Sequence, residues 1–581
     1  MAVTADGHCL ISACPGSGKT TVLSHRAGYL LGTHGQDKLA AVTFSSEAAG
    51  ELLTRIRRQT QGHDQRVTAG TFHKLAKDQL AGAGIRVRLI TEAQARALTL
   101  MCMRSAGFDG DLDKAMMYIQ ARKVAGAGSV VVTGRGEDDE EIDDVYQEYQ
   151  AALRHRGVHD FQDLLLMAVE GMRNRSVKPL PVQHMLVDEA QDADDLQWAW
   201  VMEHVNVGCR VTAVGDDDQT IYGWRLASGF RGLQRFREAT GATYIPLDTT
   251  YRCAPEILRH AARVIEHNRE RLPKRLVTAN EIQGRVHAKS MKTRAAEAVS
   301  IRETLQGGDP NEWAVLARTN SILDALELEL GRAKIVYKRI GGTSVWARKL
   351  PALFLSMLES FVSWDIHGIE SALQLLGASP SGLRSLMERC EASKPGSLHR
   401  FVDRPLGKGS DGTALAQLQS LCGEWRDLAN ANQAEAVIRA VQIWIQKAFG
   451  TRRAFDDGYI HLDACALRLT GKVDEDKEKE AKKRKLTLAQ RIALVKQKPP
   501  EDPERPGVRL ITCHGCKGLE FDRVWLMGCE EGVLPDSRSD PEEERRLFYV
   551  GMTRARKELV VSSGSTPVSS FFAEAALQIS A

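Results

Sequence analysis

The sequence predicts an α/β fold with two α/β domains, each interrupted by a mostly helical insertion. Short apolar segments alternate with amphipathic ones near the N-terminus, and the same alternation returns twice later in the chain. This rhythm is typical of a parallel sheet with helices on both faces. Between these regions, about residues 75–181 and 350–502, the pattern is mostly helical. A chain of 581 residues is also too long for a single hydrophobic core.

The first α/β domain is predicted to be split by the first insertion. Strand patterns occupy its two ends, and turn residues separate them from helical patterns. The acidic run Glu137–Asp144, inside the insertion, is predicted to be a solvated surface loop. The expected strands are His8–Ala13, Leu39–Phe44, His184–Val187 and Arg210–Val214, and the expected helices are Lys19–Leu31 and one that begins at Ser46.

The second α/β domain is predicted to begin near Tyr251 and to be split in the same way. A mixed-charge run in its insertion, Gly471–Lys485, is expected to be an exposed helix or loop. The strands expected here are Trp313–Ala317, Val508–Thr512, Arg523–Met527 and Val560–Ser563.

Composition excludes several classes of protein without naming one. The 43% apolar and 26% charged residues are ordinary for a globular domain, and a net charge of +3 does not indicate a nucleic-acid partner. No apolar window is long enough for a membrane span, and the N-terminus does not resemble a secretory signal. Eleven irregularly spaced cysteines indicate reduced thiols in the cytoplasm. Cys513 and Cys516 form a C-x-x-C pair, which could be a redox or half-zinc motif, but no second pair with ligand spacing lies nearby, so metal binding is disfavoured.

A phosphate-binding loop is predicted between the first strand and the first helix. Glycines let backbone N–H groups approach phosphate, and the helix directs its positive dipole end toward them. Lys19 would supply a charge to the β and γ phosphates, and Thr20 a hydroxyl for Mg²⁺. Ala13 stands where the usual pattern has its first glycine. The candidate loop residues are Ala13, Gly16, Ser17, Gly18, Lys19 and Thr20.

Two carboxylates follow an apolar strand pattern and complete a predicted NTPase site. Asp188 would hold Mg²⁺, and Glu189 would orient and deprotonate the attacking water. The alternative is an acidic pair in an ordinary turn. Together the loop and the pair predict nucleotide hydrolysis, but they do not say what the hydrolysis drives.

Asp188-Glu189-Ala190-Gln191-Asp192 resembles the D-E-x-Q-D box of superfamily 1 DNA helicases of the UvrD, PcrA and Rep group. The other boxes of that group follow in order over nearly the whole chain. They are Ala41–Ala49, Gly70–His73, Val214–Ala227, Tyr251-Arg252, Val315–Asn320, Gly341-Gly342, Leu510–Phe521 and Glu543–Ala555.

The resemblance implies two RecA-like P-loop NTPase domains, each with a mostly helical insertion. Residues 1–74 and 182–250 would form domain 1A, with 75–181 as insertion 1B. Residues 251–349 and 503–581 would form domain 2A, with 350–502 as insertion 2B.

The resemblance also implies roles around the nucleotide. Gln191 and Gln219 would sense the γ-phosphate, and Arg252 and Arg554 would be arginine fingers entering from domain 2A. For either arginine, a surface salt bridge is the alternative.

Three further residues would surround the nucleoside. Tyr251 would stack on the adenine, Arg26 would lie on the other side of the base, and Glu520 would contact the ribose. A core tyrosine remains the alternative for Tyr251.

The DNA track implied by the resemblance uses stacking and is tolerant of sequence. Phe44, Tyr222 and Trp224 would stack on bases. Thr71, His73 and His514 would contact the backbone or couple to it. Core packing is the alternative for the aromatics, and a structural role for the histidines.

The implied activity is an ATP- and Mg²⁺-dependent helicase that moves 3′-to-5′ on single-stranded DNA and unwinds duplexes during repair, replication or recombination. Its implied partners are single strands and single/double-strand junctions, with no membrane and with protein partners unknown. A translocase that strips proteins from single strands, and a nucleic-acid-stimulated switch NTPase, remain open as alternatives.

The sequence departs from the family in two places that bear on function. An upstream segment that reads the adenine edge in the family has no counterpart before Ala13, so the preference for ATP over other nucleotides stays open. The duplex-gripping G-I-G turn has at best a degenerate counterpart near Ser379–Leu383, which leaves duplex binding by insertion 2B open.

Overall fold

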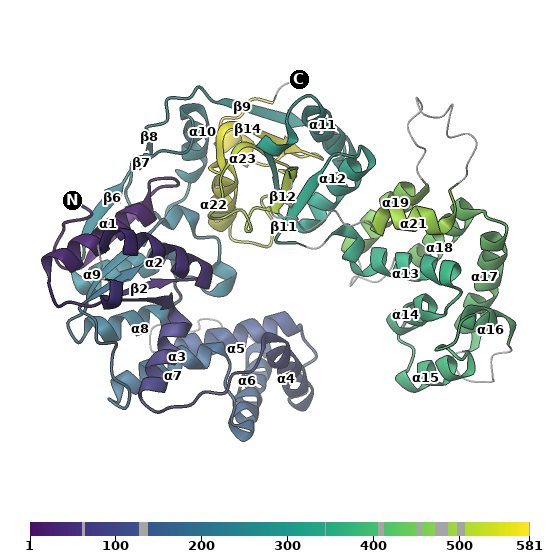
Figure 1. Ribbon diagram of the computed structural model, residues 1–581, viewed down its shortest axis with the longest axis horizontal. Coiled ribbons are helices and arrows are strands. Elements are labelled where there is room, and N and C mark those ends of the chain that lie inside the picture. The colour runs from purple at the N-terminus through teal and green to yellow at the C-terminus, as the bar shows by residue number, and fades with distance from the viewer. Residues whose placement is uncertain are drawn as a thin grey trace. The chain divides into compact units, whose positions relative to one another are not determined.

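The computed structural model describes residues 1–60, 64–126, 137–342, 344–404, 412–449, 456–470, 486–496 and 506–579 (Figure 1). These residues form two compact units. The first unit contains residues 1–286, 535–558 and 570–578. The second contains residues 287–534, 559–569 and 579–581. Each unit is described by itself.

A six-stranded sheet in the order β3-β2-β4-β5-β1-β6 forms the centre of the first unit. All of its neighbouring strands are parallel, and Cys9 of the first strand pairs in register with Thr212 on one side and Thr243 on the other. The first four strands expected from the sequence are present, within a residue or two of their predicted ends. The strands are β1 (Cys9–Ala13), β2 (Leu39–Thr43), β3 (Val67–Thr71), β4 (His184–Val187), β5 (Arg210–Gly215) and β6 (Thr243–Leu247).

Helices cover both faces of this sheet, as a buried parallel sheet requires. Successive residues of β1 show the alternation: Cys9 and Ile11 pack into the apolar cluster of the first pair of helices, and Leu10 packs into the cluster on the other face. The helices on the first face are α1 (Lys19–Thr33) and α2 (Ser46–Thr60). Those on the second face are α3 (Phe72–Gly82), α7 (Phe161–Arg173), α8 (Asp195–Val205) and α9 (Gly229–Thr240).

The first insertion is helical, as predicted, but its acidic run is not a loop. Residues 137–144 form the start of α6 (Glu137–Arg156), where acidic side chains favour a helix N-terminus. Ile142, Val145, Tyr149 and Leu153 recur at helical spacing and are buried in a small core. The other helices of this core are α4 (Glu92–Ser105) and α5 (Leu112–Gly126).

Further elements of the first unit follow the sheet in sequence. The two-stranded pair β7 (Thr249–Thr250) and β8 (Val277–Thr278) flanks α10 (Pro255–Ile265), and α10 packs on α22 (Pro541–Met552). Three short 3-10 turns follow strands β4 and β5. They are η2 (Ala190–Asp192), η3 (Asp217–Gln219) and η4 (Gly223–Arg225).

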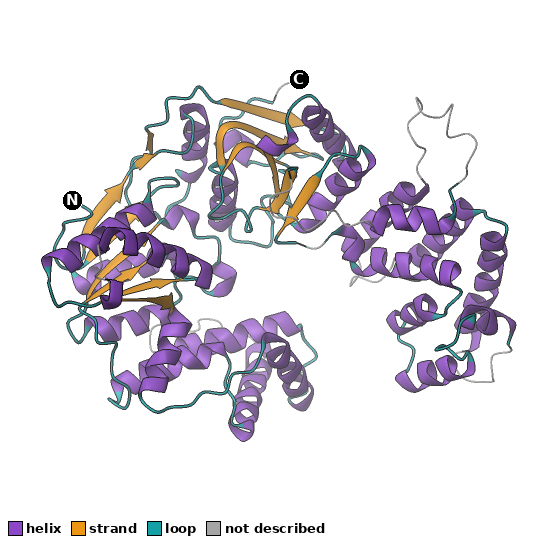
Figure 2. Cartoon of the chain, in the orientation of Figure 1, coloured by secondary structure: helices purple, strands orange, loops and turns teal. Residues whose placement is uncertain are grey.

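A second six-stranded sheet has the order β11-β12-β10-β13-β14-β9 (Figure 2). Its apolar core in the second unit is formed by strand residues that pack against α11 (Arg294–Gln306) and α12 (Asn320–Arg332). The predicted strand Arg523–Met527 begins two residues earlier. The strands are β9 (Arg285–Ser290), β10 (Trp313–Ala317), β11 (Tyr337–Ile340), β12 (Val508–Thr512), β13 (Phe521–Leu526) and β14 (Ala555–Ser563).

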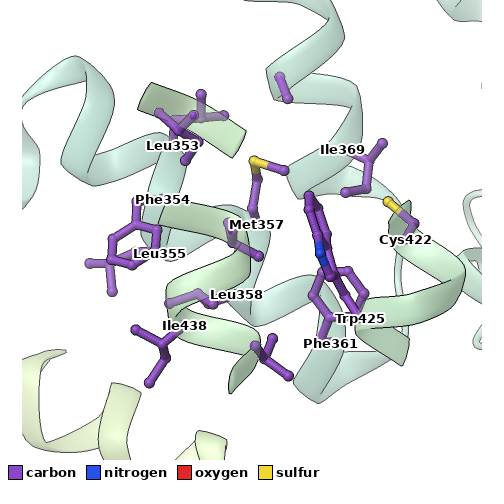
Figure 3. Packing of buried hydrophobic residues seen from close by; sticks show 14 of the residues in the cluster. Leu353, Phe354, Leu355, Met357, Leu358, Phe361, Ile369, Cys422, Trp425 and Ile438 are labelled. Atoms are coloured by element: carbon purple, nitrogen blue, oxygen red, sulfur yellow. The ribbon is translucent and has the colours of Figure 1, made fainter. Parts of the chain in front are cut away.

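The second insertion is a helical module with its own core (Figure 3). Leu353, Phe354, Met357 and Phe361 of the first helix line that core at helical spacing. The predicted exposed run 471–485 lies outside the described residues, and residues 379–383 contain the Ser379 cap and first turn of α15. The helices are α13 (Lys349–Ser363), α14 (His367–Leu375), α15 (Pro380–Arg389), α16 (Ser397–Asp403), α17 (Gly412–Asn430), α18 (Ala434–Phe449), α19 (Asp456–Thr470) and α21 (Leu488–Lys496).

All eleven cysteines are buried thiols. The Cys516 thiol donates to the backbone carbonyl of Cys513 at 3.0 Å, so this pair is part of the packing of a turn. Among the described residues, no helix is both long enough and apolar enough to cross a membrane.

Candidate nucleotide and DNA site

The candidate residues of the first unit lie at the carboxyl ends of its parallel strands. These ends share one edge of the sheet, which is where ligands bind in open α/β folds. Along that edge, Thr71 ends β3, Phe44 follows β2, Asp188 follows β4, Asp216 follows β5 and the phosphate loop follows β1. Of the predicted DNA residues, Thr71 and Phe44 lie at the β3–β2 end of this edge, whereas Tyr222 and Trp224 follow β5, next to the strand β1 that leads into the phosphate loop.

The phosphate loop has the backbone shape that its glycines permit. Gly16 and Gly18 have φ angles of 73° and 81°, in the left-handed region that favours glycine. Gly18 is the N-cap of α1, so the N-terminus of that helix opens directly onto the loop. This arrangement presents backbone N–H groups and a positive dipole end, which together bind phosphate.

The carboxylate of Glu189 joins the loop to the turn after β4. Its Oε2 accepts from Nζ of Lys19 at 3.0 Å and from Nε2 of Gln191 at 2.7 Å. Glu189 itself has φ 50°, an uncommon left-handed conformation for a residue with a side chain. Glu189, the predicted general base, is thus brought together with Lys19 and Gln191.

Burial and like charge shift the pKa values of this group. Burial, with the neighbouring Glu189 carboxylate, raises the pKa of Asp188 to about 7. Burial alone would lower the pKa of Lys19, but the carboxylates of Glu189, Asp216 and Asp188 outweigh it and raise the pKa. Lys19 is therefore a permanent cation in a site rich in carboxylates, and Asp188 is a carboxyl that a cation would ionise.

A hydrogen-bonded chain continues from Gln191 to the second predicted glutamine and to an arginine. The Oε1 of Gln191 accepts from the backbone N–H of Asp216 at 2.9 Å. The carboxylate of Asp216 accepts from Nε2 of Gln219 at 2.5 Å, and Oε1 of Gln219 accepts from Nη2 of Arg554 at 2.7 Å. Gln219 and Arg554 are buried, so these bonds lie in a low-dielectric interior.

The phosphate loop also touches the segment that carries Tyr251 and Arg252. The backbone N–H of Tyr251 donates to the carbonyl of Gly16 at 3.0 Å. A Cβ on Gly16 would lie 2.6 Å from Cβ of Arg252 and 2.9 Å from Oγ1 of Thr250. The ring of Tyr251 is 69% exposed, so it is not a core tyrosine. Tyr251, Arg252 and Arg554 all belong to the same compact unit as the loop.

The side chain of Arg26 is buried and bonded within the fold. The side chain is 1% exposed, and each of its three nitrogens has a partner. Nε donates to Oγ1 of Thr212, Nη1 to the carbonyls of Ala2 and Val3, and Nη2 to Sγ of Cys9. The expected contact with the base is corrected accordingly, because these bonds hold the guanidinium within the fold between α1 and the sheet.

The residues present fit a nucleotide with its Mg²⁺. The Oγ of Ser17 is buried in the loop and has no hydrogen-bond partner among the described residues. A buried hydroxyl without a hydrogen-bond partner lowers the stability of the folded state unless a ligand bonds to it. The hydroxyl of Thr20 and the carboxyl of Asp188 are oxygen donors of the kind that Mg²⁺ prefers.

The predicted DNA residues differ in exposure. Trp224 is 51% exposed and Phe44 is 37% exposed, whereas Tyr222 is half-buried. The Arg225 guanidinium lies 4.4 Å from the ring centre of Trp224 and 5.7 Å from that of Tyr222, which supports both rings from one side.

Two of the other predicted DNA residues also stabilise local structure. The Thr71 side chain accepts from the backbone N–H of Lys74 and caps α3. The ring of His73 packs edge-on against Phe161 at 5.9 Å, and burial lowers the pKa of His73.

The sequence reasoning missed two residues of the first unit. Phe161, at the start of α7, is 56% exposed and touches His73, and the signal for it was an apolar residue at a capped helix N-terminus. Lys274, which is fully buried among carboxylates, lies in none of the recognised boxes, and sequence gave no signal for it.

The remaining predicted residues, His514 and Glu520, lie in the second unit between β12 and β13. Glu520 is exposed and His514 is half-buried. They are described only within that unit.

The fold and these contacts define the class of protein: a P-loop NTPase with carboxylates, glutamines and arginines gathered around its phosphate loop. Comparison with models of protein families identifies the family within this class. The model of the UvrD/REP helicase N-terminal domain matches residues 1–239, and that of the UvrD-like helicase C-terminal domain matches residues 245–363 and 467–566.

Similar proteins extend over almost the whole chain. DNA helicase II of Salmonella typhimurium is 32% identical over 96% of this chain and 82% of its own length. DNA helicase II of Haemophilus influenzae is 30% identical over the same shares. The ATP-dependent DNA helicase Rep of Escherichia coli is 28% identical over 95% of this chain and 88% of its own. The chain belongs to the UvrD/Rep helicase family, and its two α/β regions are RecA-like P-loop folds.

Proposed function

We propose that the protein is an ATP-dependent DNA helicase that moves 3′-to-5′ along single-stranded DNA and separates duplexes. The observation that carries the proposal is the order of side chains along one sheet edge. The exposed ring of Phe44 follows β2, the exposed ring of Trp224 lies in η4 after β5, and the phosphate loop follows β1. A hydrogen-bonded chain from Glu189 through Gln191 and Asp216 to Gln219 joins the turns after β4 and β5. Such an edge can connect hydrolysis to the grip on a strand. The direction of movement is taken from family membership.

The hydrolytic step is assigned to the residues around the loop. Lys19 binds the β and γ phosphates, and Thr20 and Asp188 would hold Mg²⁺, whose charge offsets that of the phosphates. Glu189 orients the attacking water and accepts its proton. Arg252 and Arg554 stabilise the negative charge on the transferring phosphoryl group, an effect worth about a thousandfold or more in rate.

The nucleoside site is assigned more narrowly. Tyr251 stacks on the base with its exposed ring, and Glu520 contacts the ribose. Arg26 is omitted because its guanidinium is bonded within the fold.

Coupling to DNA is assigned to the glutamine chain. Gln191 donates a hydrogen bond to Glu189, the proposed general base, and Gln219 accepts one from Arg554. Asp216 is hydrogen-bonded to both glutamines. Loss of the γ-phosphate would change the surroundings of Glu189 and of Arg554, which stand at the two ends of this hydrogen-bonded series. Phe44, Tyr222, Trp224 and the newly identified Phe161 would stack on bases, and Thr71, His73 and His514 would contact or position the strand.

The proposed domains are those expected from sequence. Support comes from the strands: β1–β3 and β4–β6 lie in residues 1–74 and 182–250, and β9–β11 and β12–β14 lie in 251–349 and 503–581. The proposed substrates are single strands and single/double-strand junctions, handled in the cytoplasm during repair, replication or recombination.

The test is unwinding of duplexes with a 3′ tail, a 5′ tail or no tail, with ATP, GTP or no nucleotide. ATP-dependent separation of the 3′-tailed duplex alone is the expected result. Separation of only the 5′-tailed duplex would overturn the polarity. DNA-stimulated hydrolysis that displaces a bound protein but not a strand would favour the stripping translocase, and stimulation without movement would favour a switch NTPase.

A further inference from the structure

A fully buried lysine lies next to the glutamine chain. Nζ of Lys274 is 2.5 Å from Oδ1 of Asp216, 2.8 Å from Oδ1 of Asp217 and 3.0 Å from Oδ2 of Asp218. The side chains of all four residues are 0% exposed. A charged amine is buried in such an interior only with compensating carboxylates, because removing a charge from water without a partner is strongly unfavourable.

The three carboxylates around Lys274 differ in their other contacts. Asp218 has a second cation, because Arg271 donates to both of its oxygens at 2.7 and 2.8 Å. Asp217 accepts from the backbone N–H of Leu272 at 2.7 Å and so anchors the loop that carries the lysine. Only Asp216 contacts both glutamines, through its backbone N–H and its carboxylate.

The amide orientation of Gln219 is set by its contact with Asp216. The carboxylate of Asp216 accepts from Nε2 of Gln219, which turns Oε1 of Gln219 toward Arg554. A displaced Asp216 would allow the amide to rotate, and Arg554 would lose its acceptor. Lys274 is the cation that contacts Asp216, and the adjacent carboxylates raise the pKa of Lys274 well above its usual value despite burial.

The loop that carries Lys274 also contacts the helix that precedes Arg554. Nδ2 of Asn268 donates to the carbonyl of Glu542 at 2.9 Å, and the backbone N–H of Arg269 donates to its carboxylate at 2.9 Å. Both contacts are made to α22, whose last turn leads directly to Arg554. Residues 268–274 thus join the turn with Gln219 to the helix that positions the arginine.

We infer that Lys274 is a positioning residue for hydrolysis: it holds the carboxylate of Asp216 in place, and through Asp216 it sets both glutamines relative to Glu189 and Arg554. This inference deepens the proposed function and rests on it for the roles of Glu189 and Arg554. Within the described part of the chain, the ion pairs of Lys274 all go to Asp216, Asp217 and Asp218, and Lys274 makes no hydrogen bond or ion pair to the phosphate loop or to the predicted DNA aromatics. Its removal should therefore lower turnover and leave the binding of nucleotide and DNA largely intact.

The test must separate positioning from simple stabilisation, because Lys274→Met leaves three buried carboxylates short of a cation. The variant Lys274→Met/Asp217→Asn removes one charge of each sign, and its asparagine can still accept from Leu272. Arg271→Ala is the matched control, since it removes a cation from the same cluster without touching Asp216. The melting temperature, fluorescent-nucleotide and oligo-dT affinity, and the kcat and KM for ATP with and without oligo-dT are measured in the full-length chain.

The expected result is that the double variant melts near the wild type yet loses about ten- to a hundredfold in kcat, as small displacements of catalytic groups do. Its KM for ATP and its affinities stay within about twofold, a change too small to indicate lost binding. Arg271→Ala should melt earlier and keep the kcat of the wild type. A double variant with wild-type kcat, or an equal loss of kcat in Arg271→Ala, would overturn the inference. The kcat without DNA is read separately, so a wild type that DNA fails to stimulate would count against the proposed function and not against Lys274.

Discussion

Lys19 and Gln191 both donate to one oxygen, Oε2, of Glu189, at 3.0 and 2.7 Å. The carboxylate that is proposed to activate water is therefore held by the cation of Lys19, from the phosphate loop, and by the amide of Gln191, from the turn that is proposed to couple hydrolysis to DNA. A glutamine in its place can still accept from one of these donors, but it cannot take a proton.

Glu189→Gln is expected to keep nucleotide binding and to lose hydrolysis. General-base catalysis contributes about a hundred- to ten-thousandfold, so the DNA-stimulated kcat should fall by at least about a hundredfold. Steady-state hydrolysis and fluorescent-nucleotide titration measure the two quantities. Full stimulated hydrolysis in this variant would remove Glu189 from the role of base.

Trp224→Ala is expected to weaken the grip on single strands without affecting the fold. The ring is 51% exposed, and stacking on a base is worth about 1–3 kcal/mol, so oligo-dT affinity should fall about five- to a hundredfold. Trp224→Phe keeps a stacking face and should retain most of the affinity. Anisotropy titration and the melting temperature check both expectations, and equal affinity in the alanine variant would exclude the ring from the track.

Gly16→Ala is expected to destabilise the protein more than Gly18→Ala. Both positions have positive φ, so both variants suffer backbone strain of about 1–2 kcal/mol. A Cβ on Gly16 would also lie 2.6 Å from Cβ of Arg252, whereas the nearest atom to one on Gly18 is 3.9 Å away. Melting temperatures without nucleotide isolate this difference. Equal shifts would show that the close approach to Arg252 is unimportant.

His204 is expected to make the first unit sensitive to acid. Nδ1 donates to the carbonyl of Trp200 and Nε2 accepts from the backbone N–H of Leu180, so both ring nitrogens are bonded in the neutral form. Burial lowers the pKa of His204 to about 4. The folded state then binds fewer protons than the unfolded state, so this contribution to stability is present above about pH 6.5 and is lost as the pH falls toward 4.

The size of that loss is up to about 3 kcal/mol in the free energy of unfolding of this region. Urea unfolding followed by tryptophan fluorescence at pH 7, 6 and 5 measures it, because the ring of His204 lies 4.3 Å from that of Trp200. His204→Gln does not titrate and should show a flatter pH dependence. Parallel pH curves for the two proteins would assign the acid sensitivity elsewhere.

Much of the fold followed from local sequence. The strands and the loop were predictable because apolar runs and glycines at fixed spacing determine them locally. The acidic run 137–144 favours an exposed loop by its charge, but Ile142, Val145 and Tyr149 recur at helical spacing, and the helix buries all three. The helix is therefore predictable from the sequence when spacing is weighed above charge.

Arg26 and Lys274 could not have been placed in the same way. The partners of Arg26 include Thr212, 186 residues away, and those of Lys274 lie 56 to 58 residues upstream in an acidic turn. Whether a buried cation serves a ligand or a neighbouring carboxylate depends on which chain segments the sheet brings together. Only the three-dimensional arrangement carries that information.

The left-handed backbone of Glu189 sets activity against robustness. A residue with a side chain at φ 50° costs the fold on the order of 1 kcal/mol relative to glycine, and asparagine also tolerates that region. Glu189→Gly would relieve this strain, but it would also remove the oxygen that accepts from Lys19 and Gln191, so hydrolysis should be lost without a gain in heat resistance. The strained backbone is thus retained by the ion pair with Lys19, and evolution of a hardier variant has to find its stability elsewhere in the chain.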